Sequence, residues 1–151
     1  MGRVRRRQFL AVAVALAAAP WARSQDRLPK IGFLFPNPGP KPGEPSPLGE
    51  RIRKLGWIPG KTATFELASA DGREELLPAL AAELVAKQVD VIWAAGPEAA
   101  VAAARATRVI PIAFYGVGNP IELGLVDSLA KPGRNVTGLA SGTEAWPKGV
   151  E

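Results

Sequence analysis

The residues in this sequence that could bind a ligand follow the ends of three predicted strands. Phe35, Pro36 and Asn37 follow the first strand, Gly96, Pro97 and Glu98 follow the third, and Tyr115, Gly116 and Asn119 lie at and after the fourth. They offer an amide, a carboxylate, aromatic rings and backbone N–H groups at a predicted helix start. These groups suit non-covalent recognition of a small polar solute.

Asn119 has two interpretations. Its amide could hold a polar group of a ligand, although less firmly than a carboxylate would hold an amine. The run Asn-Pro-Ile-Glu at 119–122 also has the pattern of a helix start, with an N-cap, a proline at the first helical position and an acid at the third. The capping interpretation is favoured, but a cap at the carboxyl end of a strand can serve both purposes.

The other candidates also have structural interpretations. The Tyr115 ring could stack on a ligand or close the edge of the core, and these alternatives stay open. Gly96, Pro97 and Glu98 predict a carboxylate site at a helix N-terminus, but Pro97 removes one donor and a simple tight turn is favoured. Phe35 could be a core residue.

Several kinds of chemistry are excluded by composition. The 151 residues contain no cysteine and no histidine, which removes the usual general base and every Ser-His or Cys-His pair. There is no G-x-G-x-x-G run and no P-loop for a nucleotide. We therefore expect a binding protein, not an enzyme, without a metal or a cofactor.

The excess of basic over acidic residues is confined to the start of the chain. Arg3, Arg5, Arg6, Arg7 and Arg23 precede Gln25, and the remainder carries 19 − 5 = 14 basic and 14 acidic residues, which argues against nucleic-acid binding. Residues 1–24 have a charged start, eleven apolar residues at 9–19 and a small-x-small site at 22–24. This pattern predicts an export signal of twin-arginine or general secretory type and a periplasmic protein.

The elements that must position the candidate residues alternate between strand and helix. Apolar runs predict strands at 30–35, 62–67, 89–94, 109–115 and 136–139. Four helices are predicted. The first runs from Ser46 to Gly56, the second follows a capping box at Asp71 and Glu74, and the other two span 96–107 and 120–130. Because the strands are continuously apolar, we expect a doubly wound α/β fold with a mostly parallel sheet of about five strands and helices on both faces.

Several sequence runs resemble the family of ABC-transporter substrate-binding proteins with a type I periplasmic-binding fold. They are Arg-Arg-x-Phe-Leu at 6–10, Lys-Ile-Gly-Phe-Leu at 30–34, the alanine-rich run at 77–85, Val-Asp-Val-Ile-Trp-Ala-Ala-Gly at 89–96, Val-Gly-Asn-Pro-Ile at 117–121 and Lys-Pro-Gly-Arg-Asn-Val-Thr-Gly at 131–138. The resemblance implies two α/β lobes around a cleft that holds an amino-acid-like solute, aromatic ones included. It also implies delivery of that solute to an ABC permease in the membrane.

Compared with that family, Asn119 stands where aspartate is usual and Pro97 where a small hydroxyl residue is common. The segment 37–55 is shortened, and the sequence ends where the first lobe would continue into the second. We therefore expect a truncated protein with a signal at 1–24, an N-terminal lobe at 25–141 and an irregular tail at 142–151. One alternative is a fragment that binds no solute and is either non-functional or docks onto another protein. A less favoured alternative is an α/β enzyme.

Overall fold

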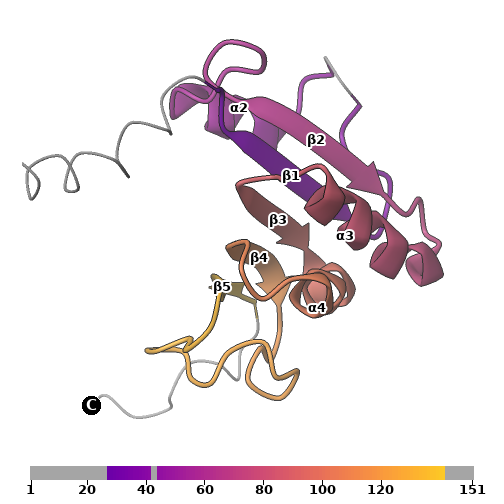
Figure 1. Cartoon of the computed structure of the whole chain (residues 1–151), viewed down its shortest axis with the longest axis vertical. Coiled ribbons are helices and arrows are strands. Elements are labelled where there is room, and N and C mark those ends of the chain that lie inside the picture. Colours follow the sequence, from indigo (N-terminus) through magenta and orange to yellow (C-terminus); the bar gives the residue numbers. More distant parts are fainter. Residues whose placement is uncertain (1–26, 42–43, 142–151) are drawn as a thin grey trace, which may run out of the picture.

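Five parallel strands form one sheet in the order β2-β1-β3-β4-β5 (Figure 1). The computed structural model describes residues 27–41 and 44–141. In chain order the elements are β1 (Lys30–Phe35), α2 (Pro47–Lys54), β2 (Thr64–Ser69), a short 3-10 helix η1 (Glu74–Leu76), α3 (Leu77–Ala86), β3 (Val91–Ala95), α4 (Gly96–Ala106), β4 (Ile112–Val117) and β5 (Val136–Ala140). The predicted α/β class and five-stranded parallel sheet are confirmed.

One face of the sheet packs against α3 and α4 and forms the main core. Gly32 faces this side, because a Cβ atom there would lie 3.2 Å from a methyl group of Leu84 on α3. Leu34, Ile92 and Ile112, one from each of the three central strands, are completely buried on the same side. Alternation along each strand therefore sends the neighbouring residues to the opposite face.

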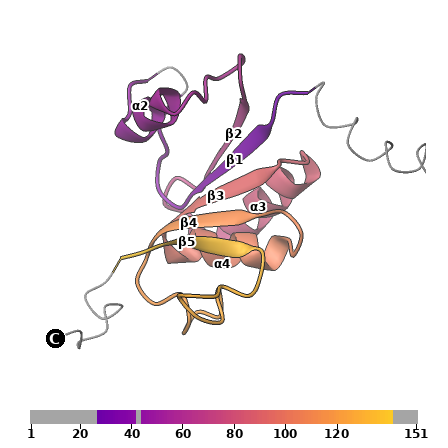
Figure 2. The same ribbon diagram turned by 90° about the vertical axis from the view of Figure 1, so that its left-hand side faces the viewer.

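The opposite face carries a row of aromatic side chains, which we call the aromatic face. Phe33 contacts Phe65, Phe35 and Trp93 with ring centroids 5.4–6.4 Å apart, and Trp93 stacks on Tyr115. Helix α2 covers the β1–β2 part of this face, where Leu48 and Ile52 line a small cavity with the phenylalanines. Figures 1 and 2 show α2 on one side of the sheet and α3 and α4 on the other, as predicted.

Two predicted helix starts have the expected local structure. The Ser46 hydroxyl accepts a hydrogen bond from the Gly49 N–H at 3.1 Å, and Pro47 begins α2. Gly56, where the sequence predicts the end of this helix, has φ of +90°. Helix α4 begins at Gly96 with Pro97 in its first turn. These residues act locally, so the sequence was sufficient to locate them.

The helix predicted over residues 120–130 is wrong. Residues 120–124 form a turn and residues 125–130 are irregular. Gly124 has φ of +66°, which interrupts a helix, and the Asp127 N–H donates to the Pro132 carbonyl instead of to a helical partner. Leu125 and Val126 are buried in the core. Burial of these two side chains replaces the packing that an amphipathic helix would have provided.

The capping box predicted at Asp71 and Glu74 is also wrong. Asp71 has φ of +51° and accepts a hydrogen bond from the Ser69 hydroxyl, two residues before it. Helical structure begins at Glu74 as a 3-10 turn without a side-chain cap, and the α-helix starts at Leu77 with Pro78 in its first turn. Pro78 has no N–H to donate, so the regular helix begins where that loss costs least.

The strands β2, β3 and β4 begin two or three residues later than predicted, because the residues before them form a turn with an isolated bridge, or bends. The predicted signal at 1–24 and the tail at 142–151 lie outside the described residues. Within residues 27–41 and 44–141, no helix has the length and apolar character needed to cross a membrane.

Candidate functional site

The carboxyl ends of β1, β3 and β4 lie side by side along one rim of the sheet. Strand β1 pairs in parallel with both β2 and β3, and β3 pairs with β4. The chain runs outward from β1 to β2 in one direction and from β3 to β5 in the other, so the order reverses between β1 and β3. Such a switch point is where open α/β sheets bind ligands. The fold thus brings the segments that carry all nine predicted residues to this rim.

The segment after β1 is fixed by the end of β2. The carbonyl groups of Phe35 and Pro36 accept hydrogen bonds from the N–H groups of Ala70 and Gly72, both at 2.9 Å. The Ser69 hydroxyl lies 3.0 Å from the Asn37 carbonyl oxygen and 2.6 Å from Asp71 Oδ1, so its single hydrogen is shared between two acceptors. Asn37 is therefore held by its backbone, and its side chain is exposed.

Ser69 and Asp71 are positioning residues, although the sequence pattern predicted Asp71 only as a helix cap and assigned no role to Ser69. The signal that could have found them is a Ser-x-Asp run directly after an apolar strand, since such short side chains bond nearby backbone groups at turns. Asp71 occupies the left-handed region of backbone conformation, which is uncommon for a residue with a side chain. The turn after β2 thus supports the β1 loop from the side opposite to β3.

Helix α4 begins directly at the rim. Gly96 has φ of +80°, and a Cβ atom there would lie 4.0 Å from Pro36 Cγ and 3.4 Å from Glu98 Oε2. The two predicted segments on either side of the switch point are therefore close together. Ala95 at the N-cap provides no side-chain cap, and the exposed Glu98 places its carboxylate beside the first turn. This negative charge occupies the position that an anionic group would favour at a helix N-terminus.

Asn119 has the capping geometry that its sequence predicts, although it starts a single turn instead of a helix. Its Oδ1 accepts a hydrogen bond from the Glu122 N–H at 3.3 Å, and its Nδ2 donates to Glu122 Oε2 at 2.9 Å. Asn119 is exposed. One amide hydrogen and one lone pair remain free of these two bonds, so the cap leaves capacity for a further contact.

Tyr115 and Phe35 both point to the aromatic face, on either side of Trp93. The Tyr115 ring stacks on Trp93 at 6.1 Å and 19°, and the Phe35 ring lies 5.5 Å from Trp93. Tyr115 is 56% exposed, whereas Phe35 also packs against Gly39 in the loop that follows β1. Trp93 contacts both of these predicted residues. Its position two residues before the end of β3 is the sequence signal that could have identified it as a site residue.

Gly116 produces a bulge at the end of β4. It has φ of +78°, and the pairing of β4 with β5 shifts register between Tyr115 and Val117. A Cβ atom at Gly116 would meet no neighbour within 4 Å, so the glycine is required by its backbone conformation and not by crowding. The bulge allows β4 to end near Asn119 while Val117 stays buried.

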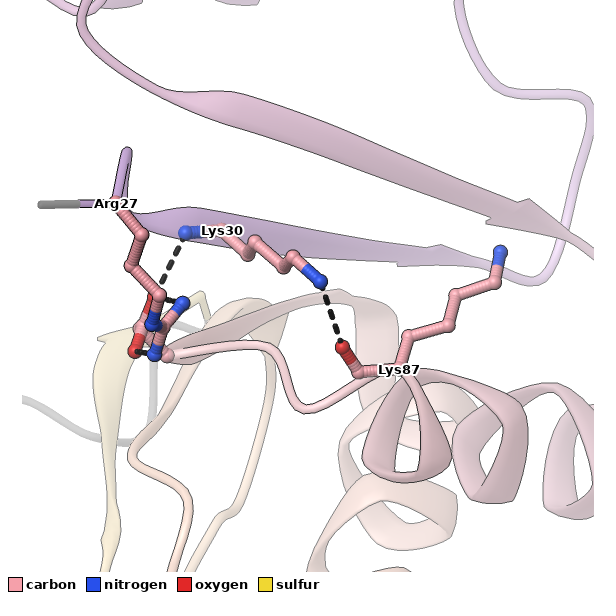
Figure 3. Close-up of polar contacts among 4 residues, drawn as sticks. Arg27, Lys30 and Lys87 are labelled. Atoms are coloured by element: carbon pink, nitrogen blue, oxygen red, sulfur yellow. Dashed lines mark hydrogen bonds and ion pairs between the residues drawn. The ribbon is translucent and has the colours of Figure 1, made fainter.

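The best-defined charged cluster lies at the other end of the sheet. Arg27 contacts both carboxylate oxygens of Asp90 at 2.6 and 3.0 Å, and the Lys30 backbone N–H donates to the same carboxylate at 2.7 Å (Figure 3). The backbone hydrogen bond from Lys30 is the main cause that lowers the pKa of Asp90, and the Arg27 guanidinium adds to it. This cluster fastens the start of β1 to the start of β3 and is separate from the rim.

Comparison with known proteins places this geometry in a family. The model of the family described as ABC transporter substrate binding protein matches residues 48–151. A protein named "Tyrosine-binding protein" from Clostridioides difficile (strain R20291) is 36% identical over 89 residues, which are 59% of this chain and 26% of that protein.

Three solved structures have similar folds. A domain from Streptococcus pneumonia in complex with L-Trp has a TM-score of 0.67 at 25% identity, covering 77% of this chain and 39% of its own. The ligand-free, open structure of a substrate-binding protein with adhesive properties from Clostridium difficile has a TM-score of 0.67 at 26% identity, covering 78% and 41%. A conserved domain protein from Vibrio cholerae has a TM-score of 0.68 at 28% identity, covering 77% and 40%. The chain spans about two fifths of these structures and about a quarter of the curated relative.

Proposed function

Because this chain belongs to the family of ABC transporter substrate-binding proteins, we propose that it binds a small amino-acid-like solute for an ABC-type importer. The proposed site is the rim formed by the ends of β1, β3 and β4. The observation that carries the proposal is the meeting of the β1 loop and the start of α4 at the switch point, where a Gly96 Cβ would approach Pro36 to 4.0 Å.

The side chains at the rim suit an amino acid. The Glu98 carboxylate beside the first turn of α4 favours an ammonium group over a carboxylate. The remaining hydrogen of the Asn119 amide can bond a carboxylate or a carbonyl oxygen. The names of two similar proteins, a tyrosine-binding protein and a domain in complex with L-Trp, support an aromatic solute. The exposed Tyr115 ring would then provide a surface for stacking.

We expect the affinity of this chain for a solute to be weak. High-affinity sites enclose most of the surface of a ligand, whereas among the described residues the loops bound this rim on one side. Isothermal calorimetry with tyrosine, tryptophan and their aliphatic counterparts measures the affinity directly. A submicromolar dissociation constant would contradict this expectation.

A thermal-shift screen against the amino acids tests the proposed site. One class of amino acid should raise the unfolding temperature, and Glu98→Gln and Asn119→Ala should each reduce that rise. Glu83→Gln is the matched control, because Glu83 is exposed in the last turn of α3, and this helix runs away from the rim. If no amino acid stabilises the chain, the proposal fails and the alternative of a fragment that docks without binding a solute is favoured.

The proposal includes export to the periplasm, an ABC permease as partner and no enzymatic reaction. The supports are the signal pattern at 1–24 and the absence of histidine and cysteine from the sequence. Mass spectrometry of the secreted protein would find a new N-terminus near Gln25. An intact N-terminus on protein recovered from the cytoplasm would contradict export.

A further inference from the structure

The end of α2 and the turn that follows it form a basic corner with two protruding apolar side chains. The apolar residues are Leu55 and Trp57, which are 76% and 41% exposed. The cations around them are exposed as well: Arg51, Arg53, Lys54 and Lys61. Within residues 27–41 and 44–141 none of these four cations forms an ion pair. We propose that this basic corner docks the protein onto an anionic membrane surface.

The two faces of α2 explain how the corner is presented. Leu48 and Ile52, four residues apart, face the sheet and line the cavity beside Phe33 and Phe65. This packing anchors the helix by one side. Leu55 is the C-cap residue at the end of the helix, and its side chain extends into solvent. The helix therefore holds three cations and one apolar side chain away from the core.

Hydrogen bonds hold the turn after α2, which carries Trp57 and Lys61, in one conformation against the helix end. The Thr62 hydroxyl donates to the Gly56 carbonyl at 2.6 Å and accepts from the Ile58 N–H at 2.7 Å. The Trp57 N–H donates back to the Ile52 carbonyl of α2 at 3.1 Å. These bonds fasten the turn to the helix end, so that the two apolar residues and the cations lie at one corner of the molecule.

The chemistry of the corner favours a membrane over other anionic partners. Cations attract anionic headgroups, and tryptophan and leucine side chains enter the interfacial region of a bilayer. A surface that follows a nucleic-acid backbone would not require a leucine with three quarters of its area in water. Glu44 and Glu50 are the nearby acids along the chain, and they leave the corner with a net positive charge. The proposed solute site uses none of these residues, so the two proposals are independent.

The absence of cysteine allows a site-specific test. A Leu55→Cys variant of the full chain carries a polarity-sensitive fluorophore, and an Arg108→Cys variant carries the same label beyond the end of α4. We expect the label at 55 to shift to shorter wavelength with vesicles that contain phosphatidylglycerol, to respond little to pure phosphatidylcholine, and to lose its response at high salt. The label at 108 should stay unchanged.

Charge neutralisation completes the test. Each cation near an anionic surface strengthens binding roughly fivefold, so Arg51→Gln, Arg53→Gln and Lys54→Gln together should weaken vesicle binding on the order of 100-fold. A second triple variant with Arg73→Gln, Arg105→Gln and Arg108→Gln changes the net charge by the same amount. It should leave the fluorescence shift of the label at 55 intact. The basic start of the sequence is the same in both sets, so it cannot produce the difference.

Three outcomes would overturn the proposal. The first is no wavelength shift of the label at 55 with anionic vesicles, and the second is an equal loss of that shift in the two triple variants. The third is a larger shift with duplex DNA than with the vesicles.

Discussion

Asp90 illustrates how a single exposed carboxylate fastens two strands. Arg27 and the Lys30 N–H both contact it, and these bonds hold its pKa below the ordinary aspartate value of 3.8. A carboxylate with a lowered pKa stabilises the folded chain at pH values above its ordinary value. That contribution declines as the pH falls from the ordinary value through the lowered pKa.

We expect Asp90→Asn to destabilise the protein at neutral pH and to have a smaller effect at acid pH, where the native carboxylate is protonated. Urea unfolding of both proteins at neutral and at acid pH measures the difference. Glu75→Gln is the control, because Glu75 forms no ion pair within the described part of the chain. If Asp90→Asn destabilised the protein equally at neutral and acid pH, the ionised Asp90 carboxylate would not be the source of the stabilisation.

Gly138, in the 131–138 run, lies where the neighbouring strand leaves little room for a side chain. A Cβ atom at this position would overlap the Phe114 carbonyl oxygen and lie 2.6–2.7 Å from its ring atoms. Overpacking of this kind typically costs 1–3 kcal/mol, so we expect Gly138→Ala to lower the free energy of unfolding by about 2 kcal/mol. Gly118→Ala is the matched control, because its Cβ would lie 3.5 Å from the Ser141 carbonyl oxygen, an ordinary contact. Denaturant unfolding that gives equal losses for the two variants would contradict this explanation.

At the scale of the element, helix α3 ends in a motif whose central residue is not glycine. The Gln88 N–H donates to the Val85 carbonyl and the Val89 N–H to the Leu84 carbonyl, the pattern of a Schellman motif. Gln88 takes the left-handed position with φ of +55°. A side chain in this conformation costs energy that glycine avoids.

Gln88→Gly should therefore stabilise the protein by about 0.5–1 kcal/mol, after the entropy that glycine loses on folding is subtracted. Gln88→Ala keeps a Cβ atom and should give no such gain. Thermal unfolding of the three proteins, followed by circular dichroism, measures both effects. A stabilisation by alanine equal to that by glycine would show that backbone conformation is not the cause.

The elements also show how far local patterns extend. Ser46 and Pro47 predicted the start of α2, and Gly96 and Pro97 the start of α4, because a cap and a proline act on the residues next to them. Residues 119–122 contain the same kind of signal and form only one turn. In this segment the burial of Leu125 and Val126 in the core determined that no helix continues. Such burial depends on distant parts of the chain, so the local sequence does not reveal it.

At the scale of the whole molecule, the aromatic face is covered unevenly. Helix α2 lies over its β1–β2 part, whereas Tyr115 on β4 and Leu139 on β5 are 56% and 67% exposed. A continuous exposed apolar surface favours association. The uncovered part of this face adjoins the edge strand β5, which makes pairing between copies easier.

We expect the chain to associate reversibly as its concentration rises, and Leu139→Lys to reduce that association. Sedimentation velocity over a range of concentrations measures it. Leu129→Lys is the control, because Leu129 is also half exposed but lies in the irregular segment before β5. A wild-type chain that stays monomeric at high concentration would contradict the expectation.

The candidate site is defined partly by the sequence and partly by the tertiary structure. The sequence was sufficient to predict a parallel α/β sheet, because continuous apolar runs at 30–35 and 109–115 are a local property of the strands. It also identified the segments around Pro36, Gly96 and Asn119. Only the tertiary structure placed Pro36 beside Gly96 and made Ser69 a support for Asn37. Strand order and long-range hydrogen bonds determine these contacts, and they join residues that lie 32 or more positions apart in the chain.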